Sequence, residues 1–290
     1  MKRFALPTDG SVRCLIIVPV FNERDSVGKL VHRLRRALPR FCDVLVIDDG
    51  STDDTVRQVP VGTKVIPLPF NLGIGGAMQT GYRYAALNNY DLAVQVDGDG
   101  QHRPGEVCRL IEHLRSADVD MVVGSRFLEP VKFYHQTTIR KAGSWFLRAL
   151  IRGLTGLNIT DCTSGFRAAN RRVIDAFAHW YPEDYPEPEV IVLLHRAGFK
   201  IDELAVRMRQ RRTGQSSISL INGIFYVLKV TTCLLLDLVR RPWPMGKIDL
   251  PVKDHVAVPT HRAVPETIDP AGDWGEPAAA GGSAAQSIQA

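Results

Sequence analysis

Short apolar runs alternate with helix-like patterns through the first half of the chain. Residues 14–18 are continuously apolar, and after Pro19 apolar positions recur at helical spacing over residues 27–38. The same alternation predicts strands at residues 44–47, 65–66, 92–96 and 121–124 and helices at residues 73–87 and 104–114. It indicates an α/β fold, with a Rossmann-like, mostly parallel sheet and helices on both faces. Such sheets bind ligands beyond the carboxyl ends of their strands.

The pattern is less regular in the second half of the chain. We expect a helix near 137–152, a loop at 160–168, a helix around 187–197 and a strand near 199–207. No linker separates the halves, so we predict a single domain over residues 1–241. Its last helix, residues 218–241, is apolar but interrupted by Lys229 and Asp237, which disfavours a membrane span. We favour a helix that lies on the surface of a membrane, and a core helix or contact with a membrane-protein partner is the alternative.

The two ends of the chain differ from its middle. The first residues run into Pro7 and Gly10 without the apolar core of a signal peptide, so we expect a cytoplasmic protein, peripheral on the inner face of the cell membrane. Residues 242–290 are rich in Pro, Ala, Gly and polar residues without periodicity, which predicts a disordered tail.

Composition and charge narrow the class of protein. Hydrophobic residues make up 45% and charged residues 23% of the chain, as in folded soluble domains. The net charge of +5 favours anionic partners such as nucleotide sugars, lipid phosphates or an acidic membrane face. No nucleic-acid-binding motif accompanies this charge, so we expect no nucleic-acid partner. The five cysteines are scattered and never form C-x-x-C, which indicates neither a zinc site nor disulfides.

Two carboxylates follow the predicted strand at residues 92–96. Residues i and i+2 of an extended backbone point the same way, so Asp97 and Asp99 can reach one hard cation, and Gly98 lets a diphosphate approach. A Mg²⁺ or Mn²⁺ held there would keep positions open for phosphate oxygens and would neutralise a departing nucleoside diphosphate. The alternative is a polar turn, because Asp-Gly pairs are common in turns.

A second acidic pair, Asp48 and Asp49, ends the predicted strand at residues 44–47. It lies close to the end of the first strand, where Phe21 offers a face for stacking. A carboxylate here can accept a hydrogen bond from a base N–H or a ribose hydroxyl. The alternative is a capping role for Asp48 or Ser51 at the start of a helix.

The glycines of residues 73–76 open a predicted helix but do not form a dinucleotide-binding fingerprint. The pattern G-x-G-x-x-G counted from Gly73 requires glycine at the position of Met78. Close helix–sheet packing, or close approach to a sugar diphosphate, explains these glycines better than NAD binding does.

An ordered set of motifs resembles family 2 glycosyltransferases, and most of all their polyprenyl-phosphate sugar synthase branch. The motifs are Val18-Pro19-Val20-Phe21-Asn22-Glu23, Val46-Ile47-Asp48-Asp49-Gly50-Ser51-Thr52-Asp53, Asn71-Leu72-Gly73, Val96-Asp97-Gly98-Asp99 and Ser164-Gly165-Phe166-Arg167. The resemblance covers residues 13–220 and implies a GT-A fold, a nucleoside-diphosphate sugar donor, a divalent cation and inversion at the anomeric carbon.

The resemblance also implies roles for individual residues. The donor-binding residues would be Pro19, Phe21, Glu23, Asp48, Asp49, Gly73, Asp97, Gly98 and Arg212. The residues holding the metal and diphosphate would be Asp97, Asp99 and Gln101. Arg126 and Arg140 resemble the arginines that hold the acceptor phosphate, a task that suits the guanidinium fork. The alternative for both is a solvated or salt-bridged surface arginine. Arg212 begins an R-x-G-x-S element that resembles a loop closing over donor phosphates, and the alternative for it is an ordinary surface loop.

The acceptor is the part of the reaction that the residues leave open. A polyprenyl phosphate oxygen is already anionic and needs no strong base, whereas a sugar hydroxyl of a lipid-linked or cell-envelope glycan needs a carboxylate in reach. Glu187 and Glu189 are the candidate catalytic residues for that task, beside Asp97 and Asp99, and their Pro-Glu repeat departs from the usual pattern of the synthases. They equally fit a helix start. A non-catalytic nucleotide-sugar-binding module remains the alternative of another class.

Overall fold

The computed structural model describes most of the chain. The described backbone covers residues 12–128, 138–209 and 220–239. Within it, side chains are described outside residues 138–141, 220–225 and 237–239. The side chain of Arg140, the whole of Arg212 and the tail predicted at residues 242–290 therefore lie outside the described residues.

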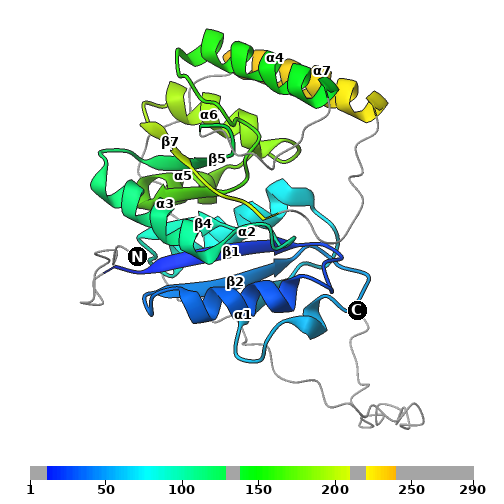
Figure 1. The fold of residues 1–290 in the computed structure, drawn as a ribbon, viewed down its shortest axis with the longest axis vertical. Helices are drawn as coiled ribbons and strands as arrows, with labels where there is room; N and C mark the ends of the chain where they lie inside the picture. Colours follow the sequence, from blue (N-terminus) through cyan, green and yellow to red (C-terminus); the bar gives the residue numbers. More distant parts are fainter. Residues whose placement is uncertain (1–11, 129–137, 210–219, 240–290) are drawn as a thin grey trace, which may run out of the picture.

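The described strands form one seven-stranded sheet in the order β3-β2-β1-β4-β6-β5-β7 (Figure 1). Their bounds are β1 Cys14–Val20, β2 Cys42–Asp48, β3 Lys64–Pro67, β4 Leu92–Gln95, β5 Met121–Ser125, β6 Arg167–Asn170 and β7 Ile201–Ala205. β6 runs antiparallel to β4 and β5, and the other pairs are parallel. The prediction of a mostly parallel sheet is confirmed, whereas the pattern did not predict β6.

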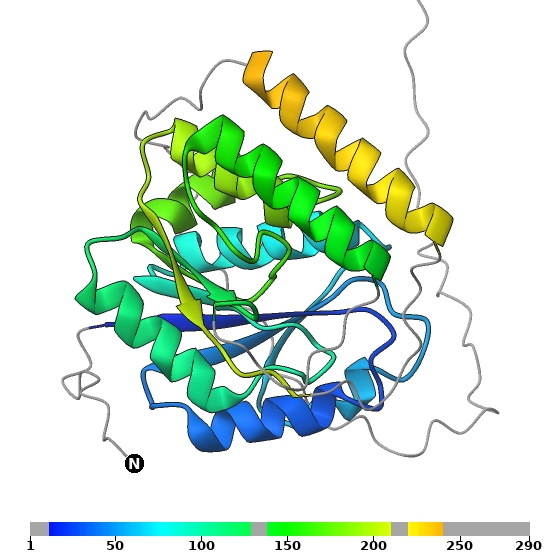
Figure 2. The same ribbon diagram turned by 45° about the horizontal axis from the view of Figure 1, so that its top comes forward.

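Helices cover both faces of this sheet, as expected (Figure 2). Their bounds are α1 Val27–Ala37, α2 Gly73–Leu87, α3 Pro104–Ser116, α4 Thr138–Thr155, α5 Arg171–His179, α6 Pro186–Arg196 and α7 Leu220–Val239, with a 3-10 turn at Val56–Gln58. One core cluster joins α1 and α3 to the sheet, and the other joins α2, α5 and α6 to the opposite face. The continuous apolar run of β1 follows from this arrangement, because the strand is buried on both faces.

The reversed strand β6 brings a distant part of the sequence to the carboxyl end of the sheet. Arg167, the first residue of β6, pairs with Gln95 of β4 on one side and with Val123 of β5 on the other. The strand ends at Asn170, whose side chain accepts a hydrogen bond from the N–H of Val173 and caps α5. The turn that precedes β6, residues 160–166, consequently lies beside the ends of β4 and β5.

Helices α4 and α7 lie side by side at the end of the molecule opposite α1 and β2 (Figures 1 and 2). Both pack on α6 through a third apolar cluster that includes Ile151, Ile191 and Leu234. Large apolar side chains nevertheless remain exposed on both helices, namely Trp145, Phe146, Leu228, Leu235 and Leu236. No helix in the described part of the chain has the length and apolar character needed to cross a membrane.

Candidate active site

Hydrogen bonds tie together the loops that follow β1 and β2. The N–H of Asn22 donates to Oγ of Ser51 at 2.9 Å, and Oδ1 of Asn22 accepts from the N–H of Thr52 at 2.9 Å. The N–H of Glu23 donates to Oγ1 of Thr55 at 2.8 Å. Asn22 adopts a left-handed conformation with φ 54°, which asparagine tolerates better than most residues. These bonds hold the end of β1 beside the end of β2.

Asp48 and Asp49 are both buried at the end of β2, but they differ in their partners. Oδ1 of Asp49 accepts from the N–H of Leu72 at 2.7 Å. Burial raises the pKa of Asp49 and the charge of Asp48 adds to the shift, against the hydrogen bonds from Leu72 and Gly73. Oδ1 of Asp48 is buried without a hydrogen-bond partner among the described residues, so it can accept from a ligand. At the 3-10 turn Val56–Gln58 the N-cap residue is Thr55, which makes no side-chain cap hydrogen bond, and Oγ of Ser51 accepts instead from the N–H of Asn22.

Pro19 and Phe21 lie between this acidic pair and the carboxylates that follow β4. Pro19 comes after Ile17, the last residue of β1 that pairs with β4, so its missing N–H removes no hydrogen bond from that pairing. A Cβ at Gly98 would lie 2.7 Å from Cγ1 of Val20 and 3.0 Å from the carbonyl oxygen of Pro19. Only glycine therefore allows the loop after β4 to approach β1 so closely. The Phe21 side chain is exposed.

The glycines at the start of α2 have different surroundings. A Cβ at Gly75 would lie 2.2 Å from the carbonyl oxygen of Pro182 and 2.3 Å from that of Glu183, so this glycine serves close packing. A Cβ at Gly73 would meet nothing within 4 Å, and the residue has φ +78°. Gly73 thus leaves open space in front of the helix, and its role in donor binding stays a prediction.

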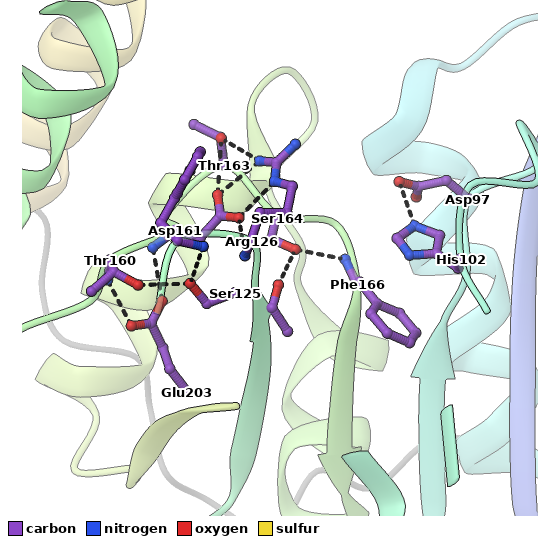
Figure 3. A network of polar contacts seen from close by, with 12 residues as sticks. Asp97, His102, Ser125, Arg126, Thr160, Asp161, Thr163, Ser164, Phe166 and Glu203 are labelled. Carbon is purple, nitrogen blue, oxygen red and sulfur yellow. Dashed lines mark hydrogen bonds and ion pairs between the residues drawn. The ribbon is translucent and has the colours of Figure 1, made fainter. Parts of the chain in front are cut away.

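Asp97 receives hydrogen bonds from both sides of its carboxylate. Nε2 of Gln95 donates to Oδ1 at 3.2 Å. Nε2 of His102 lies 3.2 Å from Oδ2 (Figure 3). Burial by itself would raise the pKa of Asp97, but the hydrogen bond and charge of His102, the Gln95 amide and the charge of Arg126 lower it below its ordinary value. These interactions thus favour the ionised form of Asp97. An anionic carboxylate at this position is suited to a cation.

His102 and Gly165 are the close neighbours of Asp97. The buried His102 ring stacks on Phe166 with 4.3 Å between ring centroids. Because an ionised carboxylate only accepts, Nε2 of His102 carries the proton of their contact. A Cβ at Gly165 would lie 3.0 Å from Oδ1 of Asp97 and 2.7 Å from Nε2 of Gln95. The predicted Ser-Gly-Phe-Arg motif thus touches the predicted acidic motif directly.

Asp99 and Gln101 form a separate pair. The N–H of Gln101 donates to Oδ1 of Asp99 at 3.0 Å, and its side-chain amide donates to Oδ2. The described residues contain no group of three or more His, Cys, Asp or Glu side chains that could hold a metal alone. Mg²⁺ is commonly held by one or two carboxylates together with substrate phosphates and water, and Asp97 with Asp99 offers that donor set.

Arg126 follows β5 and is held by a buried carboxylate. Nε and NH2 of Arg126 donate to Oδ2 and Oδ1 of Asp161 at 2.6 and 2.7 Å (Figure 3). NH2 also donates to Oγ1 of Thr163 at 3.0 Å. The Arg126 side chain is 18% exposed and that of Asp161 is 0% exposed. Arg126 is therefore an ordered, salt-bridged arginine at the end of β5, and its contact with an acceptor phosphate stays a prediction.

Glu187 and Glu189 lie in the first turn of α6, which begins one residue earlier than predicted. Glu189 is buried. Burial raises the pKa of Glu187, the charge of Asp97 adds to the shift, and the charges of Arg167 and Arg126 oppose it. The guanidinium of Arg167 is itself buried and donates to the backbone carbonyl of Glu187. The carboxyl of Glu187 thus lies within electrostatic reach of both Asp97 and Arg126.

Comparison with known proteins identifies the family to which this chain belongs. The model of glycosyl transferase family 2 matches residues 15–177, more than half of the chain. The chain belongs to glycosyl transferase family 2. This family 2 member is a glycosyltransferase enzyme, and the family predicted from the motifs is confirmed.

Curated relatives place this family 2 glycosyltransferase in the polyprenyl-phosphate sugar transferase branch. It is 35% identical to undecaprenyl-phosphate mannosyltransferase of Micrococcus luteus, over 72% of this chain and 88% of the relative. It is 30% identical to polyprenol monophosphomannose synthase of Mycolicibacterium smegmatis, over 71% of this chain and 81% of the relative.

Solved structures confirm the GT-A fold of the family 2 enzyme. Glucosyl-3-phosphoglycerate synthase from Mycobacterium tuberculosis, crystallised with Mg²⁺ and uridine diphosphate, superposes with a TM-score of 0.59 at 20% identity, over 78% of this chain and 79% of that one. Mannosyl-3-phosphoglycerate synthase from Rubrobacter xylanophilus superposes with a TM-score of 0.58 at 18% identity, over 79% and 76% of the two chains.

Sequence reasoning missed several residues of this family 2 site. Asp161 and Glu203 order Arg126 and its neighbouring turn, His102 contacts Asp97, and Arg167 holds the start of α6. His102 and Arg167 stand inside the quoted motifs or next to them, and that proximity could have pointed to them. Asp161 also stands near a quoted motif, three positions before Ser164. Glu203 carries no such signal, because its partners lie 42 and 43 positions away in sequence.

Proposed function

We propose that this family 2 glycosyltransferase moves a sugar from a nucleoside-diphosphate sugar to a polyprenyl phosphate, with inversion at the anomeric carbon and with Mg²⁺ or Mn²⁺. The observation that carries the proposal is the arrangement at one end of the sheet of Asp97, which contacts Gln95 and His102, and the buried Arg126–Asp161 pair. The first suits a cation that accompanies a diphosphate, and the second suits an acceptor phosphate. The names of the relatives from M. luteus and M. smegmatis agree with this acceptor class.

The donor would lie across the ends of β1, β2 and β4. The unpartnered Oδ1 of Asp48 would accept a hydrogen bond from the nucleoside, with Asp49, Glu23 and Pro19 around it. The exposed ring of Phe21 would stack on the base. The diphosphate would approach the backbone at Gly73 and Gly98, with Arg212 as a further predicted contact. These assignments follow the predicted motif roles and the open space at Gly73.

Asp97 and Asp99 would hold the divalent cation, with Gln101 as a third ligand through its side-chain oxygen. The fit rests on the donor set, since two carboxylates stand two residues apart and Asp97 keeps its negative charge. When bound, the cation would neutralise the charge that develops on the leaving nucleoside diphosphate. The residues of this chain would orient the diphosphate and exclude water from the anomeric carbon.

Attack by a phosphate oxygen needs no strong base. The oxygen is already anionic, so its bond to the anomeric carbon forms as the bond to the diphosphate breaks on the opposite face. Arg126, with Arg140 as a second predicted contact, would hold the acceptor phosphate through charge-assisted hydrogen bonds. Neither Glu187 nor Glu189 has to accept a proton in this reaction, and Glu187 would serve to shape the acceptor side.

A second acceptor class is favoured by one observation. Burial raises the pKa of Glu187, and its carboxyl lies within electrostatic reach of Asp97 and Arg126. A carboxyl group with a raised pKa can act as a general base toward a sugar hydroxyl. Transfer to a hydroxyl of a lipid-linked or cell-envelope glycan is therefore the alternative, with Glu187 or Glu189 as the base.

The exposed apolar face of α4 and α7 supports peripheral association with the cytoplasmic face of a membrane. Trp145 is 66% exposed on α4 and Leu228 is 61% exposed on α7. The basic pair Arg240-Arg241 follows α7 in the sequence and would suit anionic headgroups. The face is near the site, because the Tyr226 ring of α7 packs on Tyr185 just before α6, with ring centroids 4.9 Å apart. A lipid phosphate could then reach the site from the membrane surface.

The reaction is tested with the full chain, undecaprenyl phosphate and a panel of nucleoside-diphosphate sugars, with Mn²⁺, with Mg²⁺ and with chelator. We expect a lipid-linked sugar phosphate of inverted configuration with one class of donor, only when a cation is present. Mass analysis identifies the product, and NMR coupling constants give its configuration. Transfer only to a glycan hydroxyl would favour the alternative acceptor. Donor binding without any transfer would favour the non-catalytic binding module.

Membrane association is tested by flotation with vesicles of neutral lipid, with and without anionic phosphatidylglycerol. We expect the double substitution Leu235→Ser, Leu236→Ser to lower partitioning at least about tenfold, because both side chains lose apolar area that the bilayer would cover. Val61→Ser is the matched control, because Val61 is equally exposed but lies just before β3, away from α4 and α7. Equal partitioning of the two variants would contradict this docking face.

A further inference from the structure

The guanidinium of Arg126 is fixed along one edge. Its Nε and NH2 both bind the carboxylate of Asp161, and the backbone N–H of Arg126 donates to the same Oδ2 at 3.0 Å. Figure 3 shows the third guanidinium nitrogen pointing away from Asp161, toward the side of the network on which Asp97 lies. A bidentate pair of this kind fixes the plane of the guanidinium as well as its position.

Asp161 is in turn fixed by a carboxylate from another strand. Oε1 of Glu203, in β7, accepts from the N–H of Asp161 at 2.8 Å, and Oε2 accepts from the N–H of Thr160 at 2.7 Å. Oγ of Ser125 and Oγ1 of Thr160 lie 2.6 Å apart, which joins the turn to the end of β5 (Figure 3). Both oxygens of Glu203 are thus committed to the backbone of this turn.

The end of this turn, at Ser164 and Phe166, is attached to β5 as well. Oγ of Ser164 donates to the carbonyl of Gly124 at 2.7 Å and accepts from the N–H of Phe166 at 3.3 Å. A Cβ at Gly124 would lie 2.8 Å from Cδ1 of Phe166, so the packing leaves no room for a larger residue. The turn therefore cannot shift relative to β5 without breaking several contacts at once.

A carboxylate so deeply buried as Asp161 serves poorly as a simple stabiliser. The desolvation penalty of burying two charges offsets much of the free energy of their attraction. A buried ion pair is therefore weak evidence for a purely stabilising role. Its benefit is orientation, because a long arginine side chain would otherwise sample many rotamers and lose entropy on meeting a phosphate. A site that holds its ligand-binding group in advance avoids that loss.

We propose that Glu203 and Asp161 are positioning residues that act in series, Glu203 on the turn at residues 160–161 and Asp161 on Arg126, and that together they fix the orientation of the guanidinium that meets the acceptor phosphate. The inference rests on the proposed function in that Arg126 meets the acceptor phosphate. Neither carboxylate touches a substrate. The two carboxylates affect the binding of the acceptor, and they leave the donor site at β1, β2 and β4 unchanged.

The test is kinetic, with undecaprenyl phosphate as the acceptor and the donor selected by the panel described above. Asp161→Asn keeps the size of the side chain but places an amide NH2 against the guanidinium, donor against donor. We expect the acceptor KM to rise about 10- to 100-fold, as loss of an orienting partner commonly costs, while the donor KM stays within about twofold. Glu203→Gln should act in the same direction, because its amide can accept from only one of the two N–H groups.

A matched control separates positioning from stability. Asp120 is a buried aspartate just before β5, at the opposite end of the strand from Arg126, and it binds Arg172 at 2.8 Å and the N–H of Lys200 at 2.9 Å. Asp120→Asn should lower the melting temperature without changing the acceptor KM. If Asp161→Asn fails to fold, Glu203→Gln carries the same comparison.

A double-mutant cycle gives the decisive result. If Asp161 acts through Arg126, adding Asp161→Asn to Arg126→Gln should raise the acceptor KM no further. Independent, multiplying effects of the two substitutions would overturn the inference, and so would an unchanged acceptor KM in both carboxylate variants. A wild-type enzyme that neither binds nor uses undecaprenyl phosphate would instead overturn the proposed acceptor, an outcome visible before any variant is made.

Discussion

The donor side and the acceptor side of the site are built in different ways. The donor side, residues 19–23, 48–55, 71–73 and 97–101, consists of loops that each follow a strand of a successive β-α unit. The acceptor side, Arg126 with residues 160–167 and 187–189, depends on the reversed strand β6 and on buried charges that are distant in sequence. Backbone shape and a few carboxylates define the first, and paired ionic side chains define the second. We therefore expect substitutions on the two sides to change different kinetic constants.

The largest effect is expected from Asp99→Ala on the donor side. Loss of a carboxylate that would hold the cation should lower kcat by roughly 10²- to 10³-fold while the protein stays folded. Turnover and a thermal melt measure the two properties. Asp118→Ala is the control, because Asp118 is an exposed acid between α3 and β5, at the opposite end of that strand from Arg126, and it pairs with Lys200. A folded Asp99→Ala enzyme with normal turnover would show that the cation is held elsewhere.

A smaller effect is expected where the two sides touch. In Gly165→Ala the new Cβ would press on Oδ1 of Asp97 and on Nε2 of Gln95, so kcat/KM should fall about 10- to 100-fold. Gly105→Ala, in the first turn of α3, is the matched substitution because a Cβ there meets nothing within 4 Å. It should leave kcat/KM unchanged and stabilise the helix by about 0.5–1 kcal/mol. Equal kinetics of the two variants would mean that the sides are independent at this contact.

Phe21→Ala should affect only the binding of the donor. Stacking of a base on an aromatic side chain contributes about 1–3 kcal/mol, so the donor KM should rise at least about fivefold while the acceptor KM is unchanged. Phe21→Tyr keeps the aromatic face and should stay within about twofold of the wild type. A change in the acceptor KM of Phe21→Ala would contradict the separation of the donor side from the acceptor side.

The smallest effect is expected from Glu187→Gln, and it decides between the two acceptors. With a phosphate acceptor the variant should keep kcat within about threefold, and its pH profile should match that of the wild type. If Glu187 were a general base, activity would rise with pH through its raised pKa as the carboxyl loses its proton. The kcat of the glutamine variant would then fall about 10²- to 10⁴-fold, and its activity would no longer rise with pH in that range. Rates from pH 5 to 9 separate these outcomes.

The sequence was informative where the chain forms local, repeating units. The strands and helices between Cys14 and Ser125 fall close to their predicted positions, because each buried strand is a continuous apolar run and each helix shows its period. The strand β6 was not predicted, because its four residues, Arg-Ala-Ala-Asn, show neither an alternating pattern nor an apolar run. Helix α5 directly after it was also not predicted.

The site divides in the same way. Asp48, Asp49, Asp97 and Asp99 stand at strand ends, so their place at one end of the sheet followed from the fold class. The Arg126–Asp161 pair joins residues 35 positions apart, and Glu203 reaches the turn from a strand 42 positions further on. No spacing rule connects such residues. Only the packing of β5, β6 and β7 brings them together.

The position of β6 also has a consequence for synthesis on the ribosome. Because β6 fills the place between β4 and β5, a growing chain that has reached only α3 carries a β4 whose outer edge has no partner. β5 cannot join the sheet until residue 170 has emerged. An unpaired strand edge is prone to associate with other chains, so nascent chains halted between β5 and β6 should be the aggregation-prone species during translation.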